Sequence, residues 1–190
     1  MKILALGLAM ILSGGIVAPV LAQTSEIIFS RKAWQVELVE NDDGTFSCVS
    51  HVTRPRGSFS IWIMDDDTAR LQFFSEEWQF EEGFADLQVQ IDRRGPWTLT
   101  NAELFENSVL FNLPNGREGI RFMREVAAGN TLYLRDDEGD DVRRFTLAGS
   151  AASMAALGEC GEAIVQDRRS GPDDFGTGGG SGRKKKNPFN

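Results

Sequence analysis

Hydrophobic and polar residues alternate over most of the chain between residues 34 and 147. Trp34, Val36 and Leu38 alternate with polar residues, and a similar pattern returns in segments 46–52, 59–63, 71–73, 87–91, 97–99, 109–113, 131–134 and 142–147. A period of two places one side of a strand in the core and the other in solvent. Polar turns such as 41–44 separate the segments. Short strands at this spacing predict a mainly β domain, an antiparallel β-sandwich or barrel.

Two segments have a helical period instead, and both are predicted to be short helices. Asn115 and Glu118 occupy N-cap and capping-box positions, and Gly129 with Asn130 supplies a stop. Between them one apolar face is formed by Ile120, Met123 and Ala127. The second helix is predicted to begin at Ser150 as N-cap and to run through alanine-rich sequence to Cys160.

The chain begins with a segment typical of secretory signal peptides. Lys2 supplies a positive charge, residues 3–21 are apolar, and the run closes on Ala22. Gly14, Gly15 and Pro19 interrupt the run, which argues against a membrane anchor, and no later stretch is long enough to span a bilayer. We therefore expect residues 1–22 to be removed and residues 23–166 to form one periplasmic or secreted bacterial domain.

Export changes the interpretation of the two cysteines, Cys48 and Cys160. In an oxidising compartment an even count favours a disulfide over a metal site or a nucleophile. A Cys48–Cys160 bond would tie the front of the domain to its last helix.

The charge changes sign near the C-terminus. The chain carries −8; without Lys2 it carries −9, and residues 167–190 contribute +3, so residues 23–166 carry −12. Such a surface repels polyphosphate, so no nucleic-acid partner is expected. Residues 167–190 are glycine-rich, and this composition predicts a disordered tail. The tail contains a basic run of Arg183, Lys184, Lys185 and Lys186. This run either contacts anionic lipid or glycan of the envelope, or only keeps the chain soluble.

The two ends of the domain carry a family resemblance. The segment 144–160, RFTLAGSAASMAALGEC, passes from a strand into an alanine-rich helix, and the Trp34 strand opens the domain. Both features resemble the ends of small periplasmic domains related to the invasion-associated locus B family, loosely over residues 33–160. The resemblance implies an exported β-sandwich with envelope association or partner binding, and it supplies no catalytic residue.

Candidate catalytic chemistry is sparse. The single histidine, His51, follows Ser50 on a predicted strand, and a catalytic triad there would need an aspartate from elsewhere. Nucleophile-elbow, dinucleotide, Walker and zinc-protease motifs are absent, so no metal or cofactor is expected. The acidic runs 65–67 and 136–141 lack the spacing of calcium loops and are interpreted as turns. A pair of scattered carboxylates suited to hydrolysis stays open.

Residues 60–84 place apolar side chains on both faces of the predicted strands. In one interpretation a helix covers the second face and all of these side chains are core. In the other, an exposed patch rimmed by glutamates binds a partner; its members are Trp62, Phe74, Trp78 and Phe80.

Three arginines form a stripe on the first helix, namely Arg117, Arg121 and Arg124. They either pair with carboxylates of their own domain or bind an anionic glycan or lipid head group.

Together these features predict a non-enzymatic interaction module that binds a protein or envelope component. The alternatives are an inhibitor of a cationic envelope hydrolase such as lysozyme, and a carboxylate-based hydrolase.

Overall fold

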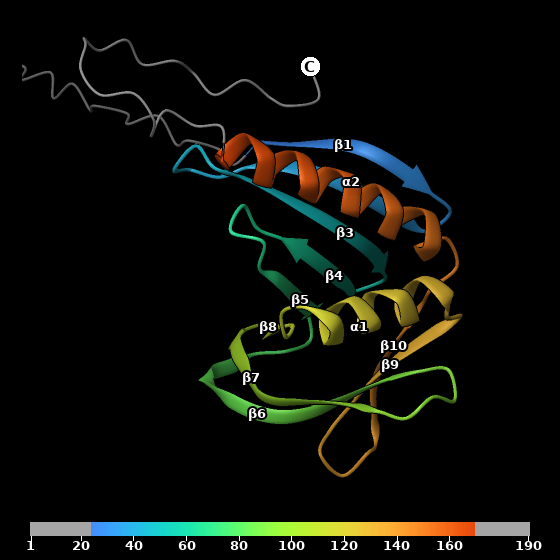
Figure 1. The fold of residues 1–190 in the computed structure, drawn as a ribbon. Coiled ribbons are helices and arrows are strands. Elements are labelled where there is room, and N and C mark those ends of the chain that lie inside the picture. Colours follow the sequence, from blue (N-terminus) through green and yellow to red (C-terminus); the bar gives the residue numbers. More distant parts are fainter. Residues whose placement is uncertain (1–23, 170–190) are drawn as a thin grey trace, which may run out of the picture.

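The computed structural model describes residues 24–169. The predicted signal peptide and the predicted basic run from Arg183 to Lys186 lie outside the described residues. Within residues 24–169 the fold is mainly β, as predicted, with ten strands in one sheet and two helices (Figure 1).

The elements follow one another in a simple order. The strands are β1 (Thr24–Arg31), β2 (Trp34–Glu40), β3 (Phe46–Arg54), β4 (Gly57–Ile63), β5 (Ala69–Ser75), β6 (Phe80–Ile91), β7 (Trp97–Glu106), β8 (Ser108–Asn112), β9 (Thr131–Arg135) and β10 (Asp141–Thr146). The helices are α1 (Arg117–Ala128), between β8 and β9, and α2 (Ser150–Arg169), after β10.

All ten strands belong to one antiparallel sheet in the order β1-β2-β3-β4-β5-β8-β7-β6-β9-β10. The sheet is curled, and both helices pack against its concave side (Figure 1). Side chains join the last strand to the first half of the sheet. The Trp34 indole Nε1 donates to the Thr146 carbonyl at 3.1 Å, and Arg54 Nη1 donates to the Arg144 carbonyl at 3.2 Å. Side chains therefore hold the two ends of the curled sheet together, since among the described strands β10 pairs only with β9.

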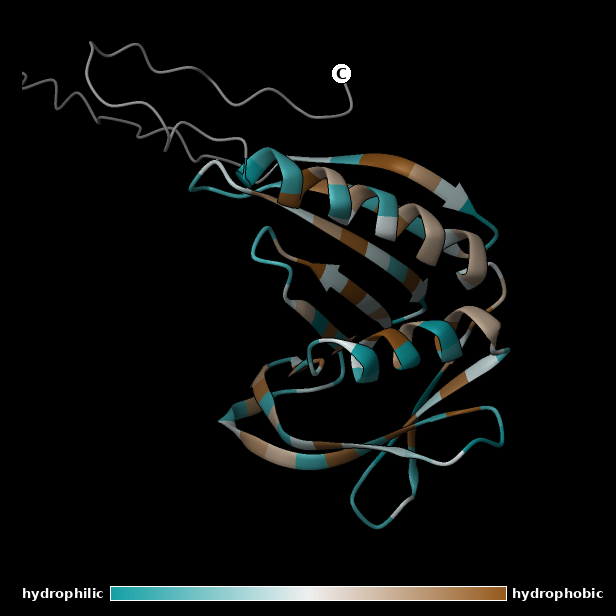
Figure 2. Ribbon diagram, viewed as in Figure 1, coloured by the Kyte–Doolittle hydropathy of each residue, from teal (hydrophilic) through white to brown (hydrophobic). Residues whose placement is uncertain are grey.

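The core lies inside the curl and draws on both halves of the sheet. The rings of Phe59 and Phe73, on β4 and β5, stack with centroids 4.9 Å apart, and Phe145 of β10 lies 5.9 Å from Phe59. All three are buried, as is Trp34. Figure 2 shows the alternating hydrophilic and hydrophobic bands along β3 that place one face of the strand in this core.

The disulfide between Cys48 on β3 and Cys160 on α2 is present as predicted, with the Cα atoms 6.1 Å apart. It fixes α2 against the sheet. Close packing continues beside it, because a Cβ added at Gly161 would lie only 3.0 Å from Cγ2 of Ile63.

Several predicted boundaries are wrong. Strand β1 was not predicted, because most of its residues are exposed and a bulge between Ile27 and Phe29 breaks its alternation. Helix α2 continues nine residues beyond the predicted end at Cys160, and so passes the predicted domain boundary at residue 166. Its last turn is held to the β4–β5 turn by an ion pair in which Arg168 Nη1 lies 3.6 Å from Asp65 Oδ1.

Both predicted helix caps are also wrong. Helix α1 starts after Gly116, whose φ of 77° favours glycine, and no side chain caps it. The Ser150 hydroxyl instead donates to the Val126 carbonyl at 2.8 Å, which links the start of α2 to α1.

Candidate functional site

An apolar groove of about 670 Å³ lies between α1, α2 and the turn that joins β4 to β5. Ligand-binding pockets commonly have volumes of roughly 300–1,000 Å³ and mostly apolar walls. The apolar lining comes from Ile63, Ala69, Gly119, Ile120, Met123, Ala127, Ala151, Met154, Ala155 and Gly158.

The groove exists because the apolar arc of α1 is wider than the core that it meets. Phe122 and Val126 are the large side chains of α1 that are buried in the core. The face predicted from the sequence, Ile120, Met123 and Ala127, lies on the adjacent side of the helix and lines the groove. Ile120 is 51% exposed. The apolar face predicted from the sequence thus lines the groove, while Met123 and Ala127 also pack against the core.

Small residues on α2 keep the opposite wall open. Ala151, Ala155 and Gly158 follow at intervals of four and three residues, which places them on one side of a helix. A Cβ added at Gly158 would meet no atom within 4 Å. A second hollow of about 430 Å³ shares Gly158, Ile63 and Ile120 with the first and continues to Arg169. The groove therefore follows most of the length of α2.

Charged side chains mark the rim of the groove. Asp66 and Asp67 line it from the β4–β5 turn, and Arg124 lines it from α1. Hydrogen bonds from the Thr68 hydroxyl and from its backbone N–H, the latter 2.9 Å long, lower the pKa of the Asp66 carboxyl. The ionised Asp66 carboxylate favours a cationic group beside the apolar lining.

The four predicted patch aromatics are half-buried and lie in two places. Trp62 and Phe74 are on the convex face of the sheet, where Trp62 pairs with Arg70, four positions along β5 from Phe74. The Trp62 indole Nε1 donates to Gln72 Oε1 at 3.0 Å. Both helices lie on the other side of the sheet, so no described helix covers this face (Figure 1).

The other two aromatics, Trp78 and Phe80, pack on each other with centroids 5.4 Å apart and also contact the core. The Arg143 guanidinium lies 5.8 Å from the Trp78 ring centroid. The structure therefore joins Trp78 to Phe80, without forming a single four-residue patch.

The predicted arginine stripe is also divided. The Arg121 guanidinium lies 4.2 Å from the Trp97 ring centroid, and its Nε is 3.9 Å from Glu125 Oε1. Arg124 borders the groove, while Arg117 is exposed in the first turn. Arg121 is thus engaged within the domain, and Arg124 is the member of the stripe that lines the groove.

The residues considered for catalysis do not meet. His51 points to the convex face, with Nε2 3.7 Å from Glu37 Oε1. Ser50 points to the concave face, where its buried Oγ has no hydrogen-bond partner among the described residues. Adjacent strand residues point to opposite sides, so Ser50 and His51 cannot form a nucleophile–base pair.

The acidic runs 65–67 and 136–141 contain the turns of two hairpins, as predicted. In the first, the Met64 N–H donates to the Thr68 carbonyl, and in the second the Asp136 N–H donates to the Asp140 carbonyl. Among residues 24–169, no group of three or more His, Cys, Asp or Glu side chains is placed to hold a metal ion.

No helix in this described part is long and apolar enough to cross a membrane.

Comparisons with protein-family models, with curated proteins and with solved structures find no match for this chain. Its function is therefore inferred from its own residues and their geometry. The groove was not predicted from the sequence, although the apolar face of Ile120, Met123 and Ala127 is the signal that leads to it.

Proposed function

We propose that the protein is a non-enzymatic binding module of the bacterial envelope that holds an apolar segment of a protein partner in the α1–α2 groove. The observation that carries this proposal is the partly open apolar face of α1, where Ile120 is 51% exposed beside Met123. Apolar surface of this kind, rimmed by charged residues, is typical of interaction sites.

The shape and charge of the groove favour an amphipathic helical segment with basic residues. The groove follows α2, and helical ligands place apolar anchors three and four residues apart in such grooves. Met123 and Met154 line it with flexible side chains that adapt to different anchors. Asp66 and Asp67 on the rim attract a basic partner.

An envelope location is supported by two features. The Cys48–Cys160 disulfide suits an oxidising compartment, and residues 1–22 resemble a signal peptide. The resemblance to the invasion-associated locus B family leads to the same proposal, since it implies envelope association or partner binding.

Gly158→Leu tests the groove directly. The new side chain would enter open space inside the groove, and replacement of a helix-interior glycine does not weaken the helix. Ala152→Leu adds the same side chain at an exposed position of α2 that does not line the groove.

The binding assay uses residues 23–190 and a fluorescent amphipathic helical peptide with leucine anchors and lysine flanks. The unmodified protein and Ala152→Leu are expected to bind this peptide equally, while Gly158→Leu binds at least about tenfold more weakly, a loss of roughly 1.4 kcal/mol. Melting temperatures measured by circular dichroism establish that both variants are folded. Equal binding by Gly158→Leu and Ala152→Leu would rule out the groove as the binding site.

A further inference from the structure

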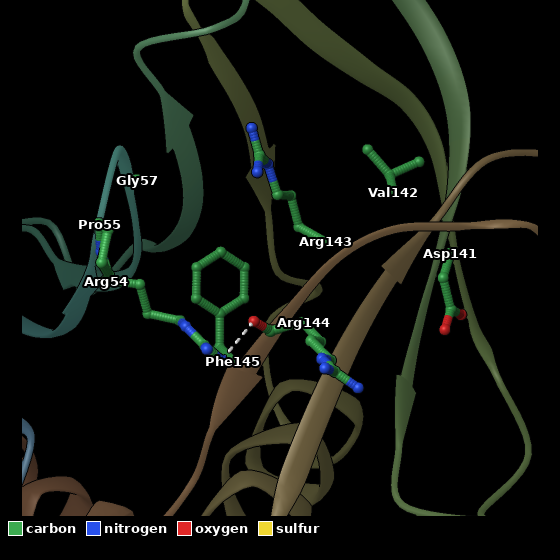
Figure 3. A pocket seen from close by; sticks show the side chains of 8 residues that line it. All are labelled: Arg54, Pro55, Gly57, Asp141, Val142, Arg143, Arg144 and Phe145. Atoms are coloured by element: carbon green, nitrogen blue, oxygen red, sulfur yellow. Dashed lines mark hydrogen bonds between the residues drawn. The ribbon is translucent and has the colours of Figure 1, made fainter.

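A separate cleft of about 500 Å³ lies between the end of the β3–β4 hairpin and the edge strand β10 (Figure 3). The β3–β4 hairpin contributes Arg54 at the end of β3, Pro55 in the turn and Gly57 at the start of β4. Strand β10 contributes Val142, Arg143 and Arg144. None of these residues lines the α1–α2 groove, so the cleft is independent of the proposed function.

Two of the cleft arginines have no carboxylate partner. Arg54 reaches from the turn toward β10 and donates to the Arg144 carbonyl at 3.2 Å (Figure 3). Among the described residues, no Asp or Glu oxygen lies within ion-pair distance of the Arg54 or Arg144 guanidinium. A guanidinium has five N–H donors, so most of the donors of Arg54 stay available to a ligand.

The neighbouring arginines share one carboxylate. Glu77 accepts from Arg143 and from Arg56, whose Nη1 lies 2.9 Å from Glu77 Oε1. Asp141 also lines the cleft, but Arg135 Nε lies 2.9 Å from its Oδ1, without the alignment of a hydrogen bond. Positive charge therefore exceeds negative charge locally, although residues 23–166 as a whole are strongly acidic.

The turn beside the cleft is held in a fixed conformation. Arg56 has φ 63°, in the left-handed region that non-glycine residues rarely adopt. Its carbonyl accepts the Glu76 N–H at 3.1 Å, and its guanidinium binds Glu77. These two contacts hold the strained residue, so the turn that follows Arg54 is positioned before any ligand arrives.

We propose that this cleft binds a ligand that presents at least two oxyanions, as carboxylate or phosphate groups. Arg54 and Arg144 supply unpaired guanidinium groups. The Arg143 side chain leaves β10 on the opposite side from Arg144 and is bound to Glu77 (Figure 3). Guanidinium matches carboxylate and phosphate geometry by donating two parallel hydrogen bonds. Acidic groups elsewhere on the surface do not prevent binding, because at physiological ionic strength charges more than roughly 8 Å away are largely screened.

Isothermal titration calorimetry of residues 23–190 with pyrophosphate and, separately, with citrate tests the proposal and distinguishes the two oxyanions. The unmodified protein is expected to bind at least one probe. Arg54→Gln and Arg144→Gln should each weaken that binding roughly ten- to a hundredfold, the usual loss for one hydrogen bond to a charged group.

Arg93→Gln is the matched control, because Arg93 is exposed, lies outside the cleft, and changes the net charge by the same amount. Unfolding curves verify that each variant is folded. The Arg144 guanidinium has no described partner, so Arg144→Gln should not alter the fold. The proposal is overturned if neither probe binds, or if Arg93→Gln weakens binding as much as Arg144→Gln does.

Discussion

Reduction of the Cys48–Cys160 disulfide is expected to lower the free energy of unfolding by about 4.8 kcal/mol. The bond spans a sequence separation of 112 residues. In the chain-entropy model, a loop of this length removes about 16 cal/mol/K from the unfolded chain, which gives this value at 25 °C. Small domains are stable by only about 5–15 kcal/mol, so the bond contributes a large share.

Comparison of the oxidised and reduced proteins isolates this effect. Both have the same side chains, and the two sulfurs stay in a fully buried site, so native packing changes little. Urea titration followed by circular dichroism, with and without a phosphine reductant, measures the difference. With a urea dependence of about 2 kcal/mol per molar, the midpoint should fall by about 2.4 M.

The double variant Cys48→Ala/Cys160→Ala provides the control. It removes the bond together with two buried sulfurs, and should therefore be less stable than the reduced protein. Oxidised and reduced proteins that unfold within about 0.3 M urea of each other would refute the reasoning, because a constraint of this length would then have no effect on the unfolded chain.

Two further predictions concern single side chains. Ser153→Ala should raise the free energy of unfolding by about 1 kcal/mol, because the buried Ser153 hydroxyl has no hydrogen-bond partner among the described residues. Ser150→Ala should lower it by about 1 kcal/mol, because that hydroxyl donates to Val126; a loss of stability in both variants would contradict the first prediction. Hydrogen bonds from Arg143 and then from Arg56 lower the pKa of Glu77, so the stability that Glu77 contributes is present above the ordinary glutamate pKa of about 4.3 and is lost as the pH falls through the lowered value. The advantage of the unmodified protein over Glu77→Gln, measured by urea titration across this range, should shrink as the pH falls, and an advantage independent of pH would exclude the mechanism.

The period-two pattern determined which residues of most strands face the core. Trp34 and Val36 are buried as the alternation predicts, and so is Phe73. Two cysteines in a chain that begins like an exported protein were enough to predict the disulfide. These features depend on neighbouring residues or on residue type alone, so they can be read without knowledge of the fold.

Strand neighbours that are distant in sequence were decided only by the tertiary structure. Strand β8 lies beside β5, and β9 lies beside β6, because the sheet curls until its two halves share one core. Alternation gives the buried face of a strand but does not identify its partner. The arginine cleft has the same origin, since Arg54 and Arg144 come together only where β10 returns to the β3–β4 turn.

The groove shows the same division within one helix. The sequence predicted that α1 is amphipathic, with Ile120, Met123 and Ala127 on its apolar face. The packed sheet instead accepts Phe122 and Val126, which are also apolar, and leaves the predicted face toward α2 and the groove. A wide apolar arc fits a core in more than one rotation, and only the shape of the surrounding sheet selects the rotation that occurs.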